Sequence, residues 1–275
     1  MRWKDAKARQ AGRHRRGAGT DRIAGPGGGR VLIYGLHAVE AAMGNPSRTV
    51  HQLFATENAE RRLAAAIAAR RLAVQRVAPA ALDRLLGADT VHQGVALEAS
   101  ALPDLGLDDL AGGRLVLVLD QVTDPHNLGA ILRSAAAFAV DAVVVTARNS
   151  PPLAGSLAKA ASGGLEHVPV IRIPNLARAL SRLGELGFDR IGLDGEAESR
   201  LEDMTVSPPV ALVLGSEGKG LRRLTRETCD RLCRLTTSGP IASLNVSNAA
   251  AVALHCVVTS PGWRGPSAAA PAAKP

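Results

Sequence analysis

Four small polar side chains gather within six residues near the C-terminus, where a loop becomes an alanine-rich apolar helix. They are Ser243, Asn245, Ser247 and Asn248. A helix needs only one N-cap, and both Ser and Asn suit that role. The other side chains need water, protein or a ligand as partners, because buried polar groups are rarely left unpaired. The stretch is therefore a candidate binding site for a polar ligand.

A second candidate, residues 119–138, begins in an apolar strand and continues into a helix. We expect the strand to end at Asp120 and Asn127 to cap the helix. Gly129 and Arg133 are four residues apart, so they share a helix face, and the glycine predicts open space beside the arginine. An arginine in that position can bind an anion, with an ordinary surface arginine as the alternative.

A third candidate is the loop after the apolar run 210–215, which carries three glycines. They are Gly215, Gly218 and Gly220, and they permit positive φ and close backbone approach. The loop is not a Walker A motif, because Lys219 is followed by glycine and not by Ser or Thr. The carboxylate of Glu217 is a poor neighbour for a phosphate. The loop therefore favours a hydroxyl-bearing or cationic ligand, with a tight structural turn as the alternative.

These three stretches belong to a regular alternation of strands and helices. The expected strands are 115–120, 141–146, 168–173, 189–194, 210–215 and 230–236. The expected helices lie near 127–139, 153–163, 175–187 and 221–227, with a last one from Asn245 to Val258. Most of the strands are nearly continuous apolar runs, which is typical of a parallel sheet covered on both faces. Ligands bind beyond the carboxyl ends of such strands, so we expect the three stretches along one edge.

A smaller α/β domain is expected to precede this one, over residues 30–101. Its strands are expected at 30–35, 51–55, 72–77 and 94–99, and its helices at 36–43, 57–71 and 78–87. Residues 102–113 read as a linker between this domain and the larger one at 114–258. Disordered tails are expected at 1–29 and 259–275.

Composition and charge favour a globular protein with a basic N-terminal tail. Hydrophobic residues make up 46% of the 275 residues, and +7 of the net charge of +8 lies in residues 1–30. That tail is either an arm that binds phosphate by counterion release or a solvated segment without a role. Three cysteines without a CxxC pair argue against disulfides or a zinc site. Neither a signal peptide nor an 18-residue apolar run is evident, so we expect a soluble cytoplasmic protein.

Together the three stretches resemble the three motifs of the SpoU-type (TrmH-like) RNA ribose 2′-O-methyltransferases of the SPOUT superfamily. The matching text is "DPHNLGAILRSA", "LGSEGKGL" and "SLNVSNAAA", in the family's order and each beyond a strand end. The first domain, with "IYGLHAVEAA" and "HQGVALEA", is similar to the substrate-binding domain of SpoU enzymes that methylate one guanosine in 23S ribosomal RNA. That domain looks like certain ribosomal proteins that bind RNA.

The resemblance implies a catalytic domain with a deep trefoil knot, an exception to the rule that chains do not thread loops. It also implies an obligate homodimer that binds S-adenosyl-L-methionine in the knot and needs no metal. By motif, the catalytic residues would be Asn127, Arg133, Glu217, Ser243 and Asn245. The cofactor-binding residues would be Gly215, Gly218, Leu235 and Leu244. The sequence departs from the family at Leu235-Thr236-Thr237, where Ile-Pro-Met is usual.

The implied reaction is methylation of the ribose 2′-hydroxyl of a guanosine in 23S rRNA. A guanidinium stays protonated, so we expect Arg133 to bind the neighbouring phosphate and stabilise the developing oxyanion. Phosphate or water would then accept the proton, and Glu217 would orient Arg133 or the ribose. The alternatives are the same chemistry on transfer RNA, or a non-catalytic rRNA-binding assembly factor. A Rossmann dehydrogenase is disfavoured because its glycine fingerprint is missing.

Overall fold

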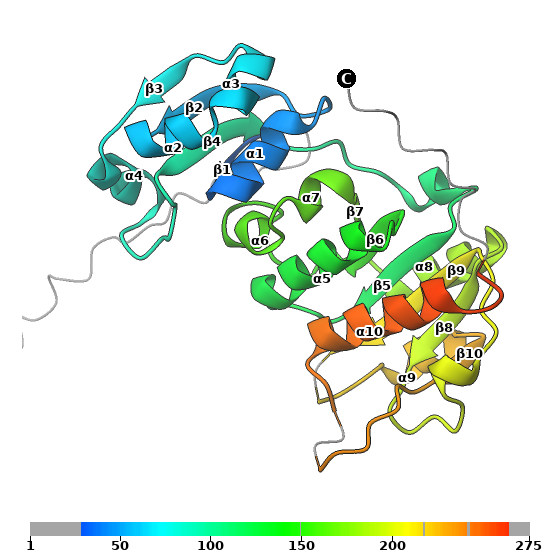
Figure 1. Cartoon of the computed structure of the whole chain (residues 1–275). Helices are drawn as coiled ribbons and strands as arrows, with labels where there is room; N and C mark the ends of the chain where they lie inside the picture. Colours follow the sequence, from blue (N-terminus) through cyan, green and yellow to red (C-terminus); the bar gives the residue numbers. More distant parts are fainter. Residues whose placement is uncertain (1–28, 149, 217, 241–242, 264–275) are drawn as a thin grey trace, which may run out of the picture.

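The computed structural model describes residues 29–263 apart from 149, 217 and 241–242. Two β-sheets organise the chain, a smaller one in the N-terminal part and a larger one in the C-terminal part (Figure 1). We call residues 30–100 the N-terminal module and residues 115–263 the C-terminal module. The tail predicted at 1–29 lies outside the described residues except for Gly29, as does the part of the predicted C-terminal tail from 264 onward.

The N-terminal module is a four-stranded sheet with order β1-β4-β2-β3. Its strands are β1 (Arg30–Tyr34), β2 (Val50–Ala55), β3 (Val74–Arg76) and β4 (Val95–Ser100). Its helices are α1 (Leu36–Gly44), α2 (Glu57–Arg62), α3 (Ala64–Arg70) and α4 (Pro79–Leu86). The single helix predicted at 57–71 is two helices, because Leu63 leaves helical geometry while its side chain is buried in the core.

The C-terminal module is a six-stranded sheet with order β10-β8-β9-β5-β6-β7, and every neighbouring pair of its strands is parallel. Its strands are β5 (Leu115–Asp120), β6 (Ala142–Thr146), β7 (Val170–Ile173), β8 (Asp189–Leu193), β9 (Val210–Gly215) and β10 (Arg231–Cys233). The strands predicted as continuous apolar runs are confirmed. Three adjacent strands, β9, β5 and β6, are almost wholly buried because helices cover both faces of the sheet.

Within the described residues, six α-helices connect and cover this sheet. They are α5 (Pro125–Ala137), α6 (Gly155–Ala160), α7 (Gly164–His167), α8 (Leu176–Glu185), α9 (Arg223–Thr228) and α10 (Val246–Thr259). Short 3₁₀ helices occupy Leu107–Leu110 and Leu201–Asp203. The apolar sides of α5 and α10 pack together on one face of the sheet, and α8 covers the other face (Figure 1).

The chain reverses direction across the sheet between β5 and β9. From β5 it proceeds outward to β6 and β7, and then it crosses over to β8 and returns to β9 beside β5. Asp120, the last residue of β5, stands in register with Gly215, the last residue of β9. In open α/β sheets such a switch point marks the crevice where ligands bind. The predicted edge is therefore confirmed for the stretch 119–138 and for the glycine-rich loop that follows β9.

The chain beyond α10 packs against the C-terminal module as far as the structure describes it. The side chain of Ser260 is buried and accepts a hydrogen bond from the backbone N–H of Val206 (2.9 Å). The guanidinium carbon of Arg114 lies over the ring of Trp263, 5.4 Å from the ring centroid. Residues 259–263, which the sequence assigned to a disordered tail, therefore belong to the folded body. The helix α10 ends at Thr259, and the pattern of apolar residues does not predict these later contacts.

Candidate active site

The first turns of α5 and α10 meet through a pair of asparagines. The side-chain N–H₂ of Asn245 donates to Oδ1 of Asn127 at 3.0 Å. Asn127 does not cap α5, contrary to the sequence prediction. The cap is Asp124, whose carboxylate accepts from the backbone N–H of His126 (3.0 Å), with Pro125 as the first helical residue. Asn127 is thereby available for a contact with a second helix.

Asn245 is itself the N-cap of α10. Its Oδ1 accepts from the backbone N–H of Ser247 at 2.9 Å and from the Ser247 hydroxyl at 2.6 Å. The family motif implies that Asn245 is surplus to helix capping, with Ser247 or Asn248 in that role, and this expectation is wrong. One amide does both tasks, with its oxygen in the helix cap and its nitrogen turned to Asn127. Ser243 lies exposed two residues earlier.

Arg133 lies on the exposed side of α5, six residues after Asn127. Its side chain makes no hydrogen bond or ion pair with the residues that the structure describes, so its charge is available to an anion. The open space predicted at Gly129 is absent. Gly129 is buried, and a Cβ at this position would overlap the Cβ of Ala160 in α6. The glycine serves the close packing of α5 on α6.

The glycine-rich loop folds back tightly on the end of β9. The backbone N–H of Gly220 donates to the carbonyl of Ser216 (3.0 Å), and a Cβ on Gly215 would overlap the backbone of Gly220. Gly218 and Gly220 adopt φ of +76° and +62°, where glycine is favoured. The close backbone approach predicted from the glycines is thus present. Glu217 lies outside the described residues, so its catalytic role stays a prediction.

A buried carboxylate that sequence reasoning missed holds this loop in place. Asp120 is 1% exposed, and it accepts from the backbone N–H (3.2 Å) and Nε (2.7 Å) of Arg222 and from the hydroxyl of Thr225 (2.7 Å). A buried charge requires such donors. They attach the far end of the glycine loop to β5, the strand that leads to α5. An acidic residue closing an otherwise apolar strand was the signal available in the sequence.

Two leucines supply apolar surface near the same edge. Leu235 is partly buried against the core, and Leu244 is 40% exposed. Between the end of β10 and α10, the backbone N–H of Thr236 donates to Glu202 (2.9 Å). Burial raises the pKa of Glu202, but hydrogen bonds from Thr236 and its own backbone outweigh this, so the pKa lies below its usual value. The carboxylate fixes the start of the segment that leads from β10 to Ser243 and α10.

The amino-acid sequence of the chain matches two known protein-family models. Residues 114–255 match the model of the SpoU rRNA Methylase family. Residues 32–105 match the model described as RNA 2′-O ribose methyltransferase substrate binding. The chain belongs to the SpoU rRNA methylase family. The resemblance drawn from the three motifs is confirmed, and the three stretches of this SpoU methylase all lie within the first match.

Curated relatives of this SpoU methylase carry a specific name. A protein of Ralstonia nicotianae is 43% identical over 231 residues, which cover 81% of this chain and 93% of the relative. A protein of Pseudomonas aeruginosa is 41% identical over 233 residues, with the same coverage of both chains. Each is named 23S rRNA (guanosine-2′-O-)-methyltransferase RlmB. The similarity extends through both modules.

Solved structures share the fold of this SpoU methylase. The SpoU methyltransferase AviRb from Streptomyces viridochromogenes superposes with a TM-score of 0.70 at 22% identity, covering 84% of this chain and 89% of that one. A structure described as an RNA 2′-O ribose methyltransferase gives a TM-score of 0.69 at 26% identity, covering 83% and 88%. These likenesses establish the α/β architecture with its parallel sheet. The trefoil knot that the motifs imply stays a prediction.

Two further observations concern only the described residues. No cluster of three or more His, Cys, Asp or Glu side chains there could hold a metal ion. No helix in that part of the SpoU methylase has the length and apolar character needed to cross a membrane.

Proposed function

We propose that this SpoU-family chain methylates the ribose 2′-hydroxyl of a guanosine in 23S rRNA, with S-adenosyl-L-methionine as the methyl donor. One observation carries the proposal. Relatives that are 41–43% identical, and of whose length the chain covers 93%, are named as enzymes of that reaction. The N-terminal module supports an RNA substrate, because it matches a substrate-binding model of RNA ribose methyltransferases.

The edge formed by β5 and β9 fits S-adenosylmethionine. The glycine loop offers backbone donors and acceptors at Gly215, where a Cβ would overlap the backbone of Gly220, and at Gly218, whose positive φ favours glycine. Leu235 and Leu244 offer apolar surface for a flat aromatic base. When bound, the cofactor supplies an electrophilic methyl group on a sulfonium sulfur. We propose these four residues as its binding residues, in agreement with the motif assignment.

The chain's own residues would place the ribose and neutralise charge. Arg133, exposed and without a partner among the described residues, would bind the phosphate beside the target nucleotide and stabilise the oxyanion that develops at O2′. Asn127 and Asn245, fixed by their mutual hydrogen bond, and Ser243 would hold the ribose hydroxyls. Placement of this kind lowers a barrier by several kcal/mol. The proton passes to phosphate or water, because a guanidinium does not accept it.

We also propose that the active form is a homodimer, as the family resemblance implies. Val252 supports this proposal, because it is 41% exposed on the outer side of α10. An apolar side chain on the outer face of a helix adjoining the site is suited to a second copy. Sedimentation of the purified chain at micromolar concentration tests the proposal, which predicts twice the chain mass of 28.4 kDa.

The reaction is tested with radiolabelled S-adenosylmethionine and two RNAs, unmodified 23S rRNA and transfer RNA, followed by mapping of ribose methylation. We expect one labelled 2′-O-methylguanosine in 23S rRNA. Label in transfer RNA alone would support ribose methylation by this chain but contradict 23S rRNA as its substrate. Cofactor binding without transfer to either RNA would indicate an assembled ribosomal particle as the substrate. No cofactor binding at all would favour a non-catalytic assembly factor.

A further inference from the structure

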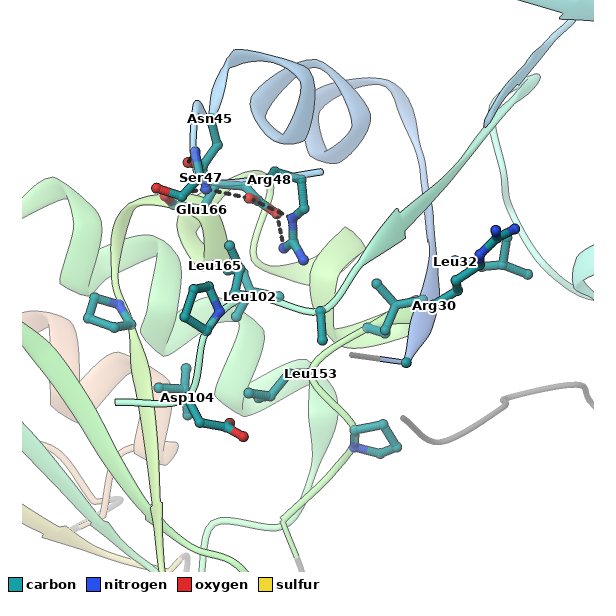
Figure 2. Close-up of a pocket in the computed structure, with 18 of the residues that line it drawn as sticks. Arg30, Leu32, Asn45, Ser47, Arg48, Leu102, Asp104, Leu153, Leu165 and Glu166 are labelled. Carbon is teal, nitrogen blue, oxygen red and sulfur yellow. Dashed lines mark hydrogen bonds and ion pairs between the residues drawn. The ribbon is translucent and has the colours of Figure 1, made fainter. Parts of the chain in front are cut away.

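A cavity of about 1450 Å³ lies where the two modules meet. Its walls come from β1 and β2 of the N-terminal module, from the segment 101–105 that follows β4, and from residues 151–156 and 165–172 of the C-terminal module. Figure 2 shows Leu32 and Arg30 on one side, with Leu102, Leu153 and Leu165 across from them. Sites for small ligands usually measure about 300–1,000 Å³. The cavity is larger, which suits a segment of a polymer.

The two walls are held together by a buried ion pair. Arg48 of the N-terminal module donates to both carboxylate oxygens of Glu166 at 2.5 and 3.1 Å, and the two side chains are only 2% and 3% exposed. Asn45 also donates to Glu166 (2.8 Å), and Arg48 donates to the carbonyl of Ser100 (2.8 Å). These bonds form one boundary of the cavity (Figure 2). The cavity is therefore preformed.

Charged side chains around the cavity are mutually neutralised. Besides Arg48 and Glu166, the pairs are Arg30 with Glu98 (3.0 Å) and Arg172 with Asp104 (3.5 Å). Each described arginine of the lining has a carboxylate partner, so none of them adds an uncompensated positive charge to the cavity. The rest of the wall is largely apolar and includes the phenyl ring of Phe54 and the imidazole of His167. Such walls suit nucleobases, which stack on aromatic and apolar side chains.

The cavity also extends to the first residue of α5, the helix that carries Asn127 and Arg133. Pro125 contributes to its lining, and this proline is the first residue of α5, two positions before Asn127. An RNA strand whose target ribose lies at Asn127 and Arg133 would thus have its neighbouring nucleotides at the mouth of the cavity. The other end of the cavity is the module that matches the substrate-binding model.

We propose that this cavity holds the single-stranded RNA next to the target nucleotide, with the bases against its apolar walls and the phosphates toward solvent. The inference rests on the proposed function, and it names where the flanking RNA binds. The N-terminal module then contributes to the cavity wall directly, and it is not only a distant tether for the substrate. Sequence preference around the target would arise from the bases that fit between Phe54, Leu32 and Leu153.

The test fills the cavity without disturbing the core. Ser156 is exposed, lies on α6 and lines the cavity. Ser156→Trp should raise KM for a 23S rRNA fragment by about tenfold, the effect of losing one stacked base. The dissociation constant of S-adenosylmethionine should not change. Ser181→Trp is the matched control, because Ser181 is an exposed helical serine on α8 outside the cavity. Phe54→Ala, which removes the aromatic surface, should raise the same KM.

The outcomes separate the two proposals. If Ser156→Trp and Phe54→Ala show the KM of Ser181→Trp, the RNA does not enter the cavity and the inference is overturned. A loss of cofactor affinity in Ser156→Trp would also overturn it, because the change would then act through the methyl-transfer site. Failure of the proposed function shows in the unaltered chain, which would transfer no methyl group to 23S rRNA.

Discussion

At the scale of single residues, the side-chain amide of Asn245 both caps α10 and contacts Asn127 in the candidate site. Its oxygen accepts from Ser247, and its nitrogen donates to Asn127. A carboxylate could replace the oxygen but not the nitrogen. Substitution can therefore separate the structural task from the catalytic one.

Asn245→Asp should keep the cap and lose the donor to Asn127. We expect its unfolding free energy to stay within about 0.5 kcal/mol of the natural chain, since Asp and Asn cap equally well, while methyl transfer falls strongly. Asn245→Ala should lose transfer and also about 1 kcal/mol of stability. Chemical denaturation and a methyl-transfer assay measure the two effects. Full activity in Asn245→Asp would show that the N–H₂ of Asn245 has no part in the reaction, because the amide of Asn127 can turn and donate to the new carboxylate.

The cysteine thiols should be unreactive in the native protein. Burial raises the pKa of Cys229 and of Cys233 to about 12, and the thiolate is the nucleophile. Iodoacetamide at pH 8 should therefore modify neither residue in the native chain and both after denaturation, as followed by mass spectrometry of peptides. Rapid native labelling of Cys233 would contradict the burial of this last residue of β10.

At the scale of elements, the contact of α5 with α6 depends on Gly129. Alanine favours helix by about 1 kcal/mol over glycine, so an open site would gain stability. At Gly129 the added Cβ would overlap Ala160, and overpacking costs about 1–3 kcal/mol. We expect Gly129→Ala to unfold at lower denaturant concentration. Gly44→Ala, where nothing lies within 4 Å of the added Cβ, is the control and should be neutral or stabilising.

The sequence predicted the elements better than their contacts. Apolar runs identify buried strands because both faces of a parallel sheet are covered, and they placed β5 and β9 with correct bounds. The cap of α5 was misassigned because Asp124 and Asn127 are both good capping residues. Pro125, which favours the first helical position, pointed to Asp124. The packing of Gly129 and the bonds of Asp120 involve distant residues, which one sequence does not reveal.

At the scale of the whole molecule, the two modules are joined by the buried pair of Arg48 and Glu166. Removal of one partner leaves the other charge buried and unpaired, whereas replacement of both by apolar residues is often neutral. Arg48→Met alone should cost about 3–5 kcal/mol in unfolding free energy, and the double variant Arg48→Met with Glu166→Leu should recover most of it. If the single variant lost nothing, the modules would not be held by this pair.

The arrangement of the modules was beyond the reach of the sequence. Periodicity and turn residues separate the two modules, but Arg48 and Glu166 are 118 residues apart and carry no shared motif. The cavity between the modules depends on that arrangement. In contrast, the three polar stretches were found from the sequence, because each follows a strand end in a fold where such ends face a ligand.

Arg133 is proposed to bind the RNA phosphate and to stabilise the oxyanion at a methyl-transfer site formed by the three stretches. The most direct measurement compares methyl transfer to 23S rRNA and binding of S-adenosylmethionine in Arg133→Ala and in Arg178→Ala, an exposed arginine on α8. We predict that Arg133→Ala lowers turnover by at least about 100-fold, as loss of an oxyanion-stabilising group does. Its cofactor affinity should be unchanged, and Arg178→Ala should match the natural chain. Near-normal turnover in Arg133→Ala would contradict this role of Arg133 in methyl transfer.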